Sequence, residues 1–461
     1  MERRIGMMLV LVGLLLVAGG CGEDRKIPAD GGTSGTVGFE GAKHERLESA
    51  ESAGNRGDGS AVPALIRMLD EDDSDLRHAA AEALGKIGDR RAVPALIATL
   101  RDRDAYVRRQ AAMSLGYIGD PSADSALALA VRDEHSEVAH AAGESLGKIG
   151  EQAVNELAEL TRHRSGQVRL IAAKNLGRTG SDQAVEPLIA RFKDEDSDVR
   201  AAAARSLAQL DDGPLRQRLI DLLRAEHWRT RAGAARTLGY CQANSAIDSL
   251  TGLLDDSRPE VRWAAANALA RMGRSAIGPL VKKLTGGTAD TRSHAAMALG
   301  RIGDSRAVPA LIDALDDDQP SVAAAAADAL GCIGHARAIK PLIKALGAEQ
   351  ATLRNAAARA LRVIGSPAVD ALIGALDAKS SRARVLAAGT LGELDSARAV
   401  KPLATALKDD VPAVRIAAAR ALGEIGHKDG LWPLLDAADD DDPAVRQAIA
   451  KAAQKVRNAN K

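Results

Sequence analysis

The hydrophobic positions of this chain repeat with a period of 30 or 31 residues. In the first period, residues 61–89, apolar side chains recur at helical spacing in two stretches separated by an aspartate-rich segment. A leucine in the second stretch marks the period twelve times, at Leu84, Leu115, Leu146, Leu176, Leu207, Leu238, Leu269, Leu299, Leu330, Leu361, Leu391 and Leu422. A fixed period of this length predicts a solenoid of stacked helix pairs rather than one globular core.

Signals for the starts and ends of helices recur with the same period. Proline suits the first turn of the first helix at Pro63, Pro94 and Pro309, because a missing N–H leaves no hydrogen bond unmade there. The aspartates expected to cap the second helix are Asp73, Asp104, Asp196 and Asp442. The glycines expected to end it in the left-handed conformation are Gly88, Gly119, Gly150, Gly303, Gly334 and Gly426.

Thirteen such units fit into residues 61–458. A polar helix within residues 43–60 is expected to cap the first unit, and residues 459–461 form a short C-terminal tail. Helices this short are marginal alone, so stacking must supply the core. Hydrophobic residues make up 46% of the chain, but aromatic residues make up only 2%. The many small alanines let neighbouring helices approach closely, so the core needs few large rings.

The units resemble HEAT repeats, in particular the short type named after phycobilisome (phycocyanobilin) lyase subunits. The resemblance includes an acid six residues before an arginine, as in Glu71 and Arg77. In HEAT repeats such residues form a ladder between units, and the resemblance implies this structural role for Arg77, Arg108, Arg200, Arg262, Arg415 and Arg446. The arginine column is interrupted at Ala139 and Ala323. The resemblance implies an all-α, right-handed solenoid with its second helices on the concave face.

Relatives of this type include scaffolds, bilin lyase subunits and iron-dependent deoxyhypusine hydroxylases, so the resemblance leaves binding and enzymatic roles open. The hydroxylases carry paired His-Glu motifs, whereas this chain has that order only at His44-Glu45, in the N-terminal cap. The nine histidines are scattered, and none forms a pair four residues apart. We therefore assign no catalytic residue, metal or other cofactor, and we favour a protein-binding role over an enzymatic one.

Residues 1–20 have the features of a signal peptide. Arg3 and Arg4 charge its start, and the apolar run over residues 7–17 is too short to span a bilayer. Small residues then lead to a cleavage site. The chain is therefore expected to be exported.

Cys21 follows Gly20 directly, which resembles a bacterial lipobox, although that family prefers leucine where Ala18 stands. The resemblance implies that Cys21 carries lipid and becomes the mature N-terminus. The polar, glycine-rich residues 21–42 would then tether the array to a membrane. The expected location is the bacterial cell envelope, periplasmic or outer face; ordinary secretion is the alternative.

Charge and cysteine usage limit the partners further. Lys+Arg and Asp+Glu both total 62, and so nearly neutral a chain is a poor nucleic-acid binder. Cys241 and Cys332 stand three units apart, about 30 Å at roughly 10 Å per helix layer, which is too far for a disulfide. We expect Cys241 to be a small core residue and Cys332 a half-exposed thiol.

The sixth unit, residues 214–244, departs most from the repeat, with six arginines and Gln242 in place of the terminal glycine. Tryptophan and arginine are common interface anchors. The candidate partner-binding residues are Trp228, Arg229, Arg231 and Trp263, with Tyr106 and Arg109 as a weaker pair. Packing in a gap left by the irregular unit is the other explanation for the two tryptophans. The HEAT resemblance places them on the concave face.

The sequence thus predicts a monomeric, lipid-anchored scaffold outside the cytoplasm that binds protein partners through one face of a solenoid. One alternative is a protein-modifying enzyme or enzyme subunit, similar to a bilin lyase or to a metal-dependent oxidoreductase such as deoxyhypusine hydroxylase. A purely architectural envelope protein is the other. A catalytic role needs a polar, metal-capable cluster on one face, whereas a scaffold needs only shape and a few anchors.

Overall fold

A computed structural model describes residues 42–460, and this part of the chain is all-α. The predicted signal peptide, the tether and Cys21 lie outside the described residues. Helix α1 (Lys43–Arg56) packs on the second helix of the first pair, and thirteen helix pairs follow. The first helices are α2 (Val62–Met68), α4 (Val93–Thr99), α6 (Asp124–Ala130), α8 (Val154–Leu160), α10 (Val185–Ala190), α12 (Gly213–Leu222), α14 (Ile247–Gly252), α16 (Ile277–Gly286), α18 (Val308–Asp313), α20 (Ile339–Ala345), α22 (Val369–Ala375), α24 (Val400–Ala406) and α26 (Leu431–Asp436).

The second helices are longer and form the inner layer. They are α3 (Ser74–Ile87), α5 (Ala105–Ile118), α7 (Ser136–Ile149), α9 (Gly166–Leu176), α11 (Ser197–Leu207), α13 (Trp228–Tyr240), α15 (Pro259–Met272), α17 (Ala289–Ile302), α19 (Pro320–Ile333), α21 (Ala351–Ile364), α23 (Ser381–Glu393), α25 (Pro412–Ile425) and α27 (Pro443–Ala459). Short 3-10 turns such as Gly59–Ala61 lead into most of the first helices.

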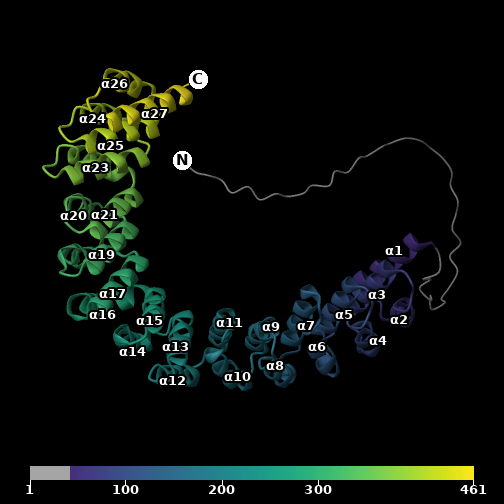
Figure 1. Cartoon of the computed structure of the whole chain (residues 1–461). Coiled ribbons are helices and arrows are strands. Elements are labelled where there is room, and N and C mark those ends of the chain that lie inside the picture. The colour runs from purple at the N-terminus through teal and green to yellow at the C-terminus, as the bar shows by residue number, and fades with distance from the viewer. Residues whose placement is uncertain (1–41, 461) are drawn as a thin grey trace, which may run out of the picture.

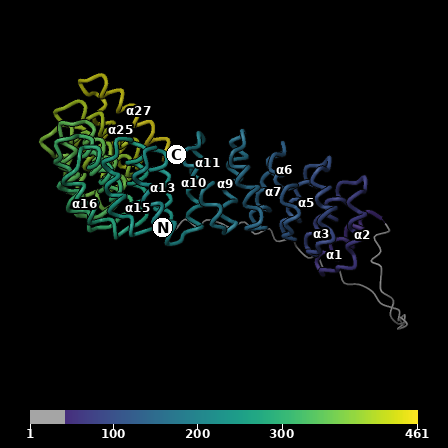
Figure 2. Tube along the Cα trace, turned by 90° about the horizontal axis from the view of Figure 1, so that it is seen from below, coloured from purple at the N-terminus to yellow at the C-terminus, as the bar shows by residue number. Residues whose placement is uncertain are grey.

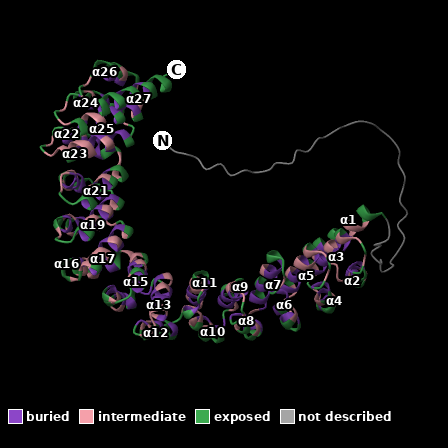
Figure 3. Cartoon of the chain, in the orientation of Figure 1, coloured by how far each residue is buried: buried purple, intermediate pink, exposed green. Residues whose placement is uncertain are grey.

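The pairs stack into an open arc with the second helices along its inner side and the first helices along its outer side (Figure 1). In the view from below, the helix pairs up to α11 lie in a row across the picture, whereas the pairs from α15 to α27 overlap because they stack along the line of sight (Figure 2). The array therefore turns between these two arms. Buried residues run between the two helix layers, and the inner and outer surfaces are left exposed (Figure 3).

The caps follow local chemistry. The side chain of Asp73 accepts hydrogen bonds from the backbone N–H groups of Asp75 and Leu76, which confirms the predicted N-cap. The same capping contact to the backbone is made by Asp104, Asp196 and Asp442. Gly88 ends α3 at φ 74° and ψ 16°, in the left-handed conformation.

The predicted left-handed cap is wrong at Gly150. This glycine has φ 88° but ψ −137°, so it is not the left-handed cap expected there. The chain passes directly from Gly150 into the 3-10 turn Gly150–Ala153, whereas Gly88 is followed by Asp89 before its turn starts. The connection is one residue shorter, and only glycine adopts this backbone conformation readily.

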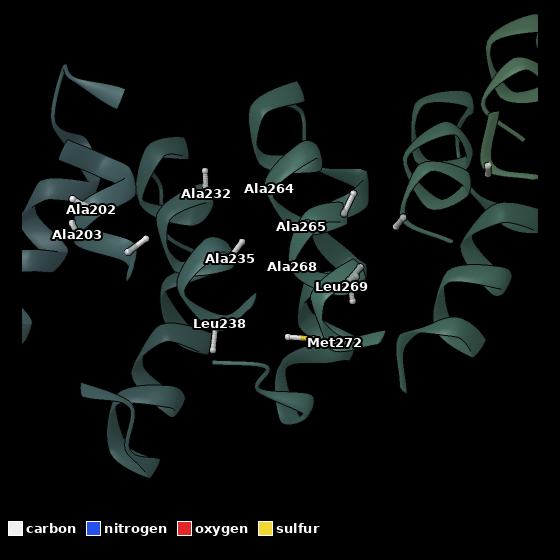
Figure 4. Close-up of a cluster of buried hydrophobic side chains, with 14 of the residues drawn as sticks. Ala202, Ala203, Ala232, Ala235, Leu238, Ala264, Ala265, Ala268, Leu269 and Met272 are labelled. Carbon is white, nitrogen blue, oxygen red and sulfur yellow. The ribbon is translucent and has the colours of Figure 1, made fainter. Parts of the chain in front are cut away.

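Alanine and leucine form a continuous core along the array. Figure 4 shows one section of this core, with Ala202 and Ala203 of α11, Ala232 and Leu238 of the adjacent helix α13, and Ala265 of α15. All of these side chains are buried. Because each layer packs only on its neighbours, the fold is a chain of similar interfaces rather than one centre.

A column of glycines brings neighbouring second helices close together. A β-carbon added at Gly300 of α17 would lie 2.7 Å from the Cα of Ala329 of α19, so no side chain fits between these helices. The column is broken at Ala208, Ala270 and Arg362. Contacts are sparse between α7 and α9, although the column keeps Gly147 there, between α11 and α13, and most of all between α21 and α23. Across this last joint, Arg362 instead forms an ion pair with Glu393 at 2.6 Å.

Candidate functional site

The arginine column joins consecutive units through paired hydrogen bonds. Arg77 donates through Nε and Nη2 to the two carboxylate oxygens of Asp102 in the next unit, at 2.7 and 2.8 Å. Its Nη1 donates to the backbone carbonyls of Glu71 and Asp72. The acid six residues earlier is thus contacted through its carbonyl, and the carboxylate partner stands 25 residues later. Bidentate pairs of this kind fix geometry as well as energy.

The ladder is incomplete in the middle and near the end of the array. Paired rungs also join Arg108 to Asp133, Arg169 to Asp194, Arg231 to Asp256, Arg292 to Asp317, Arg384 to Asp409, and Arg415 to Asp440. Arg262 reaches Asp290 instead, at 2.7 Å. Within residues 42–460, Arg200 and Arg446 bond only to backbone carbonyls. Ala139 and Ala323 supply no guanidinium.

Trp228 lines a cleft of about 940 Å³ at the edge where the first helices turn into the second. The cleft lies between α10, α12 and α13, and Lys193, Leu222 and Arg258 also line it. The Trp228 ring is half-buried, with the guanidinium carbons of Arg229 and Arg258 at 5.2 and 5.0 Å from its centroid. These cation–π contacts hold the indole against side chains of the same protein.

Two neighbours of Trp228 differ sharply in their bonding. Arg231 is a ladder rung, paired with Asp256 at 2.7 Å, so its charge is already matched. Thr230 is 5% exposed and lines the same cleft, and its hydroxyl has no hydrogen-bond partner within the described residues. The cleft therefore combines an aromatic wall with one unsatisfied polar group.

Trp263 lies on α15 and is 45% exposed. The guanidinium carbon of Arg301, from α17, is 5.9 Å from its ring centroid. The two tryptophans have different surroundings. Trp228 contacts Arg229 and Arg258 near the start of the second helices, whereas Trp263 contacts Arg301 of the next second helix. The two tryptophans thus lie on adjacent second helices, α13 and α15, and their rings do not stack on each other.

The inner layer carries further aromatic side chains. Tyr106 of α5 is 67% exposed, and Arg109 on the same helix is partly exposed. Tyr117, also on α5, is 58% exposed and stacks under the ammonium of Lys148 at 4.1 Å. Tyr240 of α13 lies between the guanidinium groups of Arg205 and Arg271, at 5.9 and 4.6 Å. Sequence reasoning missed Tyr117 and Tyr240, although their shared repeat position was a readable signal.

The cysteines and the histidines supply little further chemistry. Cys241 is half-buried, and burial, with Asp211 nearby, raises the pKa of its thiol to about 12. Cys332 is exposed rather than half-exposed. The described residues hold no group of three or more His, Cys, Asp or Glu side chains arranged to bind a metal. No helix between residues 42 and 460 is long and apolar enough to cross a membrane.

Stacked helix pairs joined by an arginine ladder define an α-solenoid. The chain belongs to the HEAT-repeat family, because the model for HEAT repeats matches seven overlapping segments: 42–105, 93–165, 154–226, 216–286, 277–362, 339–413 and 403–460. None of the curated proteins matches its sequence.

Several solved structures are similar to this chain. The karyopherin Kap121p bound to the SUMO protease Ulp1p is 12% identical, with a TM-score of 0.47 over 92% of this chain and 64% of that chain. Kap121p bound to the extreme C-terminus of the phosphatase Cdc14p is 14% identical, with a TM-score of 0.46 over 90% and 60%. Human deoxyhypusine hydroxylase in complex with glycerol is 25% identical over 53% of this chain and 100% of its own, with a TM-score of 0.26. This chain spans less than two thirds of the length of these karyopherins.

Proposed function

We propose that this HEAT-repeat solenoid is a scaffold that binds protein partners through the inner face of its arc. The observation that carries the proposal is the placement of its few large aromatic side chains. The chain has three Trp and three Tyr, and five of the six lie on second helices. Tyr106, Tyr117 and Trp263 are largely exposed there, whereas the core is built from alanine, leucine and valine.

Exposed aromatic residues on a regular surface favour binding. Tryptophan and tyrosine are enriched among interface residues whose truncation weakens binding most. A core that needs few aromatics gives no packing reason for the exposed rings of Tyr106 and Trp263. The long inner face of a solenoid also lets several anchors contact one partner at once.

A test removes the aromatic anchors from the inner face while leaving the core intact. The triple variant Tyr106→Ala, Tyr117→Ala, Trp263→Ala is compared with the native chain in affinity capture from its own cells. Capture should weaken by at least about 2 kcal/mol, the size of an interface hot spot. Trp432→Ala is the matched control, because Trp432 is 78% exposed but lies on α26 in the outer layer. Equal capture by the triple variant and the native chain would overturn the proposal.

We further propose that the scaffold is exported and anchored by lipid on Cys21. The charged start, the short apolar run and the small residues before Cys21 support this proposal. Cells that express the native chain or Cys21→Ser should be fractionated after labelling with an alkyne fatty acid. The native chain should carry label and sediment with membranes, whereas the variant should do neither. A variant that stays as membrane-bound as the parent would refute the anchor.

A further inference from the structure

The middle of the inner face carries a cluster of cations. Each second helix exposes two positions one turn apart on this side, represented by Glu82 and Lys86 in α3. In the five second helices from α9 to α17, with the 3-10 turns that continue α9 (Gly177–Thr179) and α11 (Ala208–Leu210), these two inner columns hold Lys174 and Arg178, Arg205 and Gln209, Arg236 and Tyr240, Asn267 and Arg271, and Met297 and Arg301. Acids resume in these columns at Glu144 of α7 and Asp328 of α19. A chain with no net charge thus has a basic stripe over about one third of its arc.

Most cations of the basic stripe have no anionic partner. Arg178 lies 3.6 Å from Glu144. Within residues 42–460, the side chains of Lys174, Arg205, Arg236, Arg271 and Arg301 form no ion pair or hydrogen bond. Acids of the same helices, such as Asp198 and Glu260, stand in the first turn at one edge of the stripe. The stripe is therefore a surface whose charge the protein itself does not balance.

The charge is least balanced at the joint between α11 and α13. Arg200 has no carboxylate partner, because Ala225 stands where other units place the aspartate of the ladder. Burial lowers the pKa of Arg236, and the positive charge of Arg200 lowers it further. A guanidinium does not lose its proton in a protein, so this half-buried charge stays unmatched. An external anion would relieve it.

An apolar pocket adjoins the stripe. It has a volume of about 360 Å³ between α17 and α19 and is lined by Met297, Ala325, Ala329 and Cys332. Arg301, which contacts Trp263, also lines it, as does Asp328, whose charge is paired with Arg359 at 2.9 Å. The stripe thus ends at a mainly apolar site that is large enough to admit an aliphatic side chain.

We propose that the basic stripe binds an extended acidic segment of a protein partner, with one apolar side chain of that segment in the Met297–Cys332 pocket. This inference rests on the proposed scaffold function and names the chemistry of its partner. Five helices at roughly 10 Å per layer span about 40 Å, which an extended segment of about 12 residues covers. Trp263, which is 45% exposed, supplies a flat apolar contact beside the charges. Acids along one edge of the stripe favour a single narrow chain over a wide phosphate backbone.

The test uses a fluorescein-labelled 14-residue peptide of Glu, Asp and Ser with a leucine at each end, and the full chain without its first 20 residues. Binding is measured by fluorescence anisotropy at 50 and 200 mM salt. The acidic peptide should bind, and should bind several-fold more weakly at the higher salt concentration because the contacts are ionic. The same peptide with Gln and Asn in place of the acids should not bind.

Charge reversal locates the binding. The double variant Arg236→Glu, Arg271→Glu should weaken peptide binding at least 10-fold. Arg420→Glu on α25 is the matched control, because Arg420 occupies the repeat position of Arg236 on the same inner side. It should bind the peptide as the native chain does. Circular dichroism of both variants checks that the helices are retained. Cys332→Trp, which fills the pocket, should abolish any preference for leucine over serine at the peptide ends.

Four results would overturn the inference. They are equal binding of the acidic and amide peptides, equal loss in Arg420→Glu and the double variant, tighter binding of a 14-nucleotide single strand than of the acidic peptide, and dimerisation that blocks the peptide in sedimentation. The proposed scaffold function fails separately. If native capture still depends on the inner aromatic residues while the acidic peptide does not bind, only the acidic partner chemistry is wrong.

Discussion

The ring of Phe192 occupies the space in which a side chain at Gly233 would begin. A β-carbon on Gly233 would lie 2.3 Å from Cγ of Phe192, and Phe192 is fully buried. The preceding unit has Thr161 and the following unit Leu223 at the Phe192 position, and both neighbours of the sixth unit have alanine at the Gly233 position, Ala202 and Ala264. One larger and one smaller residue thus compensate for each other where α11 and α13 meet.

This compensation predicts a strong coupling between the two residues. Gly233→Ala should destabilise the sixth unit by about 1–3 kcal/mol, because the added methyl overpacks the core. Phe192→Leu with Gly233→Ala restores the pair found in other units and should recover much of that loss. Urea unfolding of the native chain, both single variants and the double variant gives the coupling energy. If the effects of the two single variants on the free energy of unfolding simply add in the double variant, the Phe192 ring moves aside at no cost and the two residues are not coupled.

A buried carboxyl at the start of α6 predicts a pH-dependent stability. Asp124 is 7% exposed, stands where most other first helices begin with valine or isoleucine, and leaves Oδ1 without a hydrogen bond within the described residues. Burial, with Glu156 and Asp120 nearby, raises its pKa to about 6. The folded state therefore holds this proton more tightly than the unfolded chain does. Ionisation destabilises the fold as the pH rises from about 4, and the penalty is complete above about 6.

Asp124→Val should accordingly stabilise the chain at pH 7 by about 1–3 kcal/mol, and the gain should shrink as the pH falls from 6 to 4. Asp124→Asn is the matched control for ionisation, since it keeps the shape and the polarity but cannot titrate. Thermal unfolding of the three chains between pH 4 and pH 8 measures the effect. A gain that does not change with pH would mean that Asp124 is not the titrating group.

Local patterns predicted the fold because each depends on neighbours in sequence. The N-caps at Asp73 and Asp104 and the left-handed glycine at Gly88 require only backbone hydrogen bonds and conformational freedom. Gly150 differs from the predicted left-handed cap because the connection after it is one residue shorter and requires a different ψ. The presence of glycine at this repeat position does not reveal which ψ it adopts. The period itself carries this information, since the unit that contains Gly150 is one residue shorter.

The site was harder to predict because it depends on contacts between units. The sequence suggested one site formed by Trp228 and Trp263. In the structure Trp228 contacts Arg258, in the loop before α15, whereas Trp263 contacts Arg301 of the next unit. The basic stripe was missed because charge was summed over the whole chain, where acidic loops offset it, and because the cationic sixth unit was read alone rather than aligned with its neighbours. Aligning Arg205 with Arg236 by repeat position would have shown the stripe from the sequence alone.

Gln242 predicts a stabilising substitution at the end of the sixth unit. It has φ 51°, in the left-handed region that glycine occupies at Gly119 and Gly303. A residue with a β-carbon is strained there, so Gln242→Gly should raise the free energy of unfolding by about 0.5–1 kcal/mol. The reverse change, Gly119→Gln, should lower it by a similar amount. Denaturant unfolding measures both, and a loss of stability in Gln242→Gly would mean that the side chain contributes more than its backbone strain removes.

The missing rung at Arg200 predicts that the joint between α11 and α13 can be strengthened by one carboxylate. Arg200 donates Nη1 to the carbonyls of Asp194 and Glu195 at 2.7 and 2.8 Å, as the arginines of complete rungs do, but Ala225 offers no acceptor. Ala225→Asp should supply the bidentate partner and stabilise the joint by about 1 kcal/mol, because the pair is partly buried and its arginine is already held in place.

Hydrogen exchange should then show slower opening in α11 and α13 and unchanged rates in α3 and α25. Ala348→Asp is the matched control: it introduces the same carboxylate at the same repeat position, but the preceding unit has Ala323 in place of the arginine. The control should give no gain, and adding Arg200→Ala to Ala225→Asp should remove the gain. Equal protection from Ala225→Asp and Ala348→Asp would show that helix capping or net charge, rather than the rung to Arg200, produces the stability.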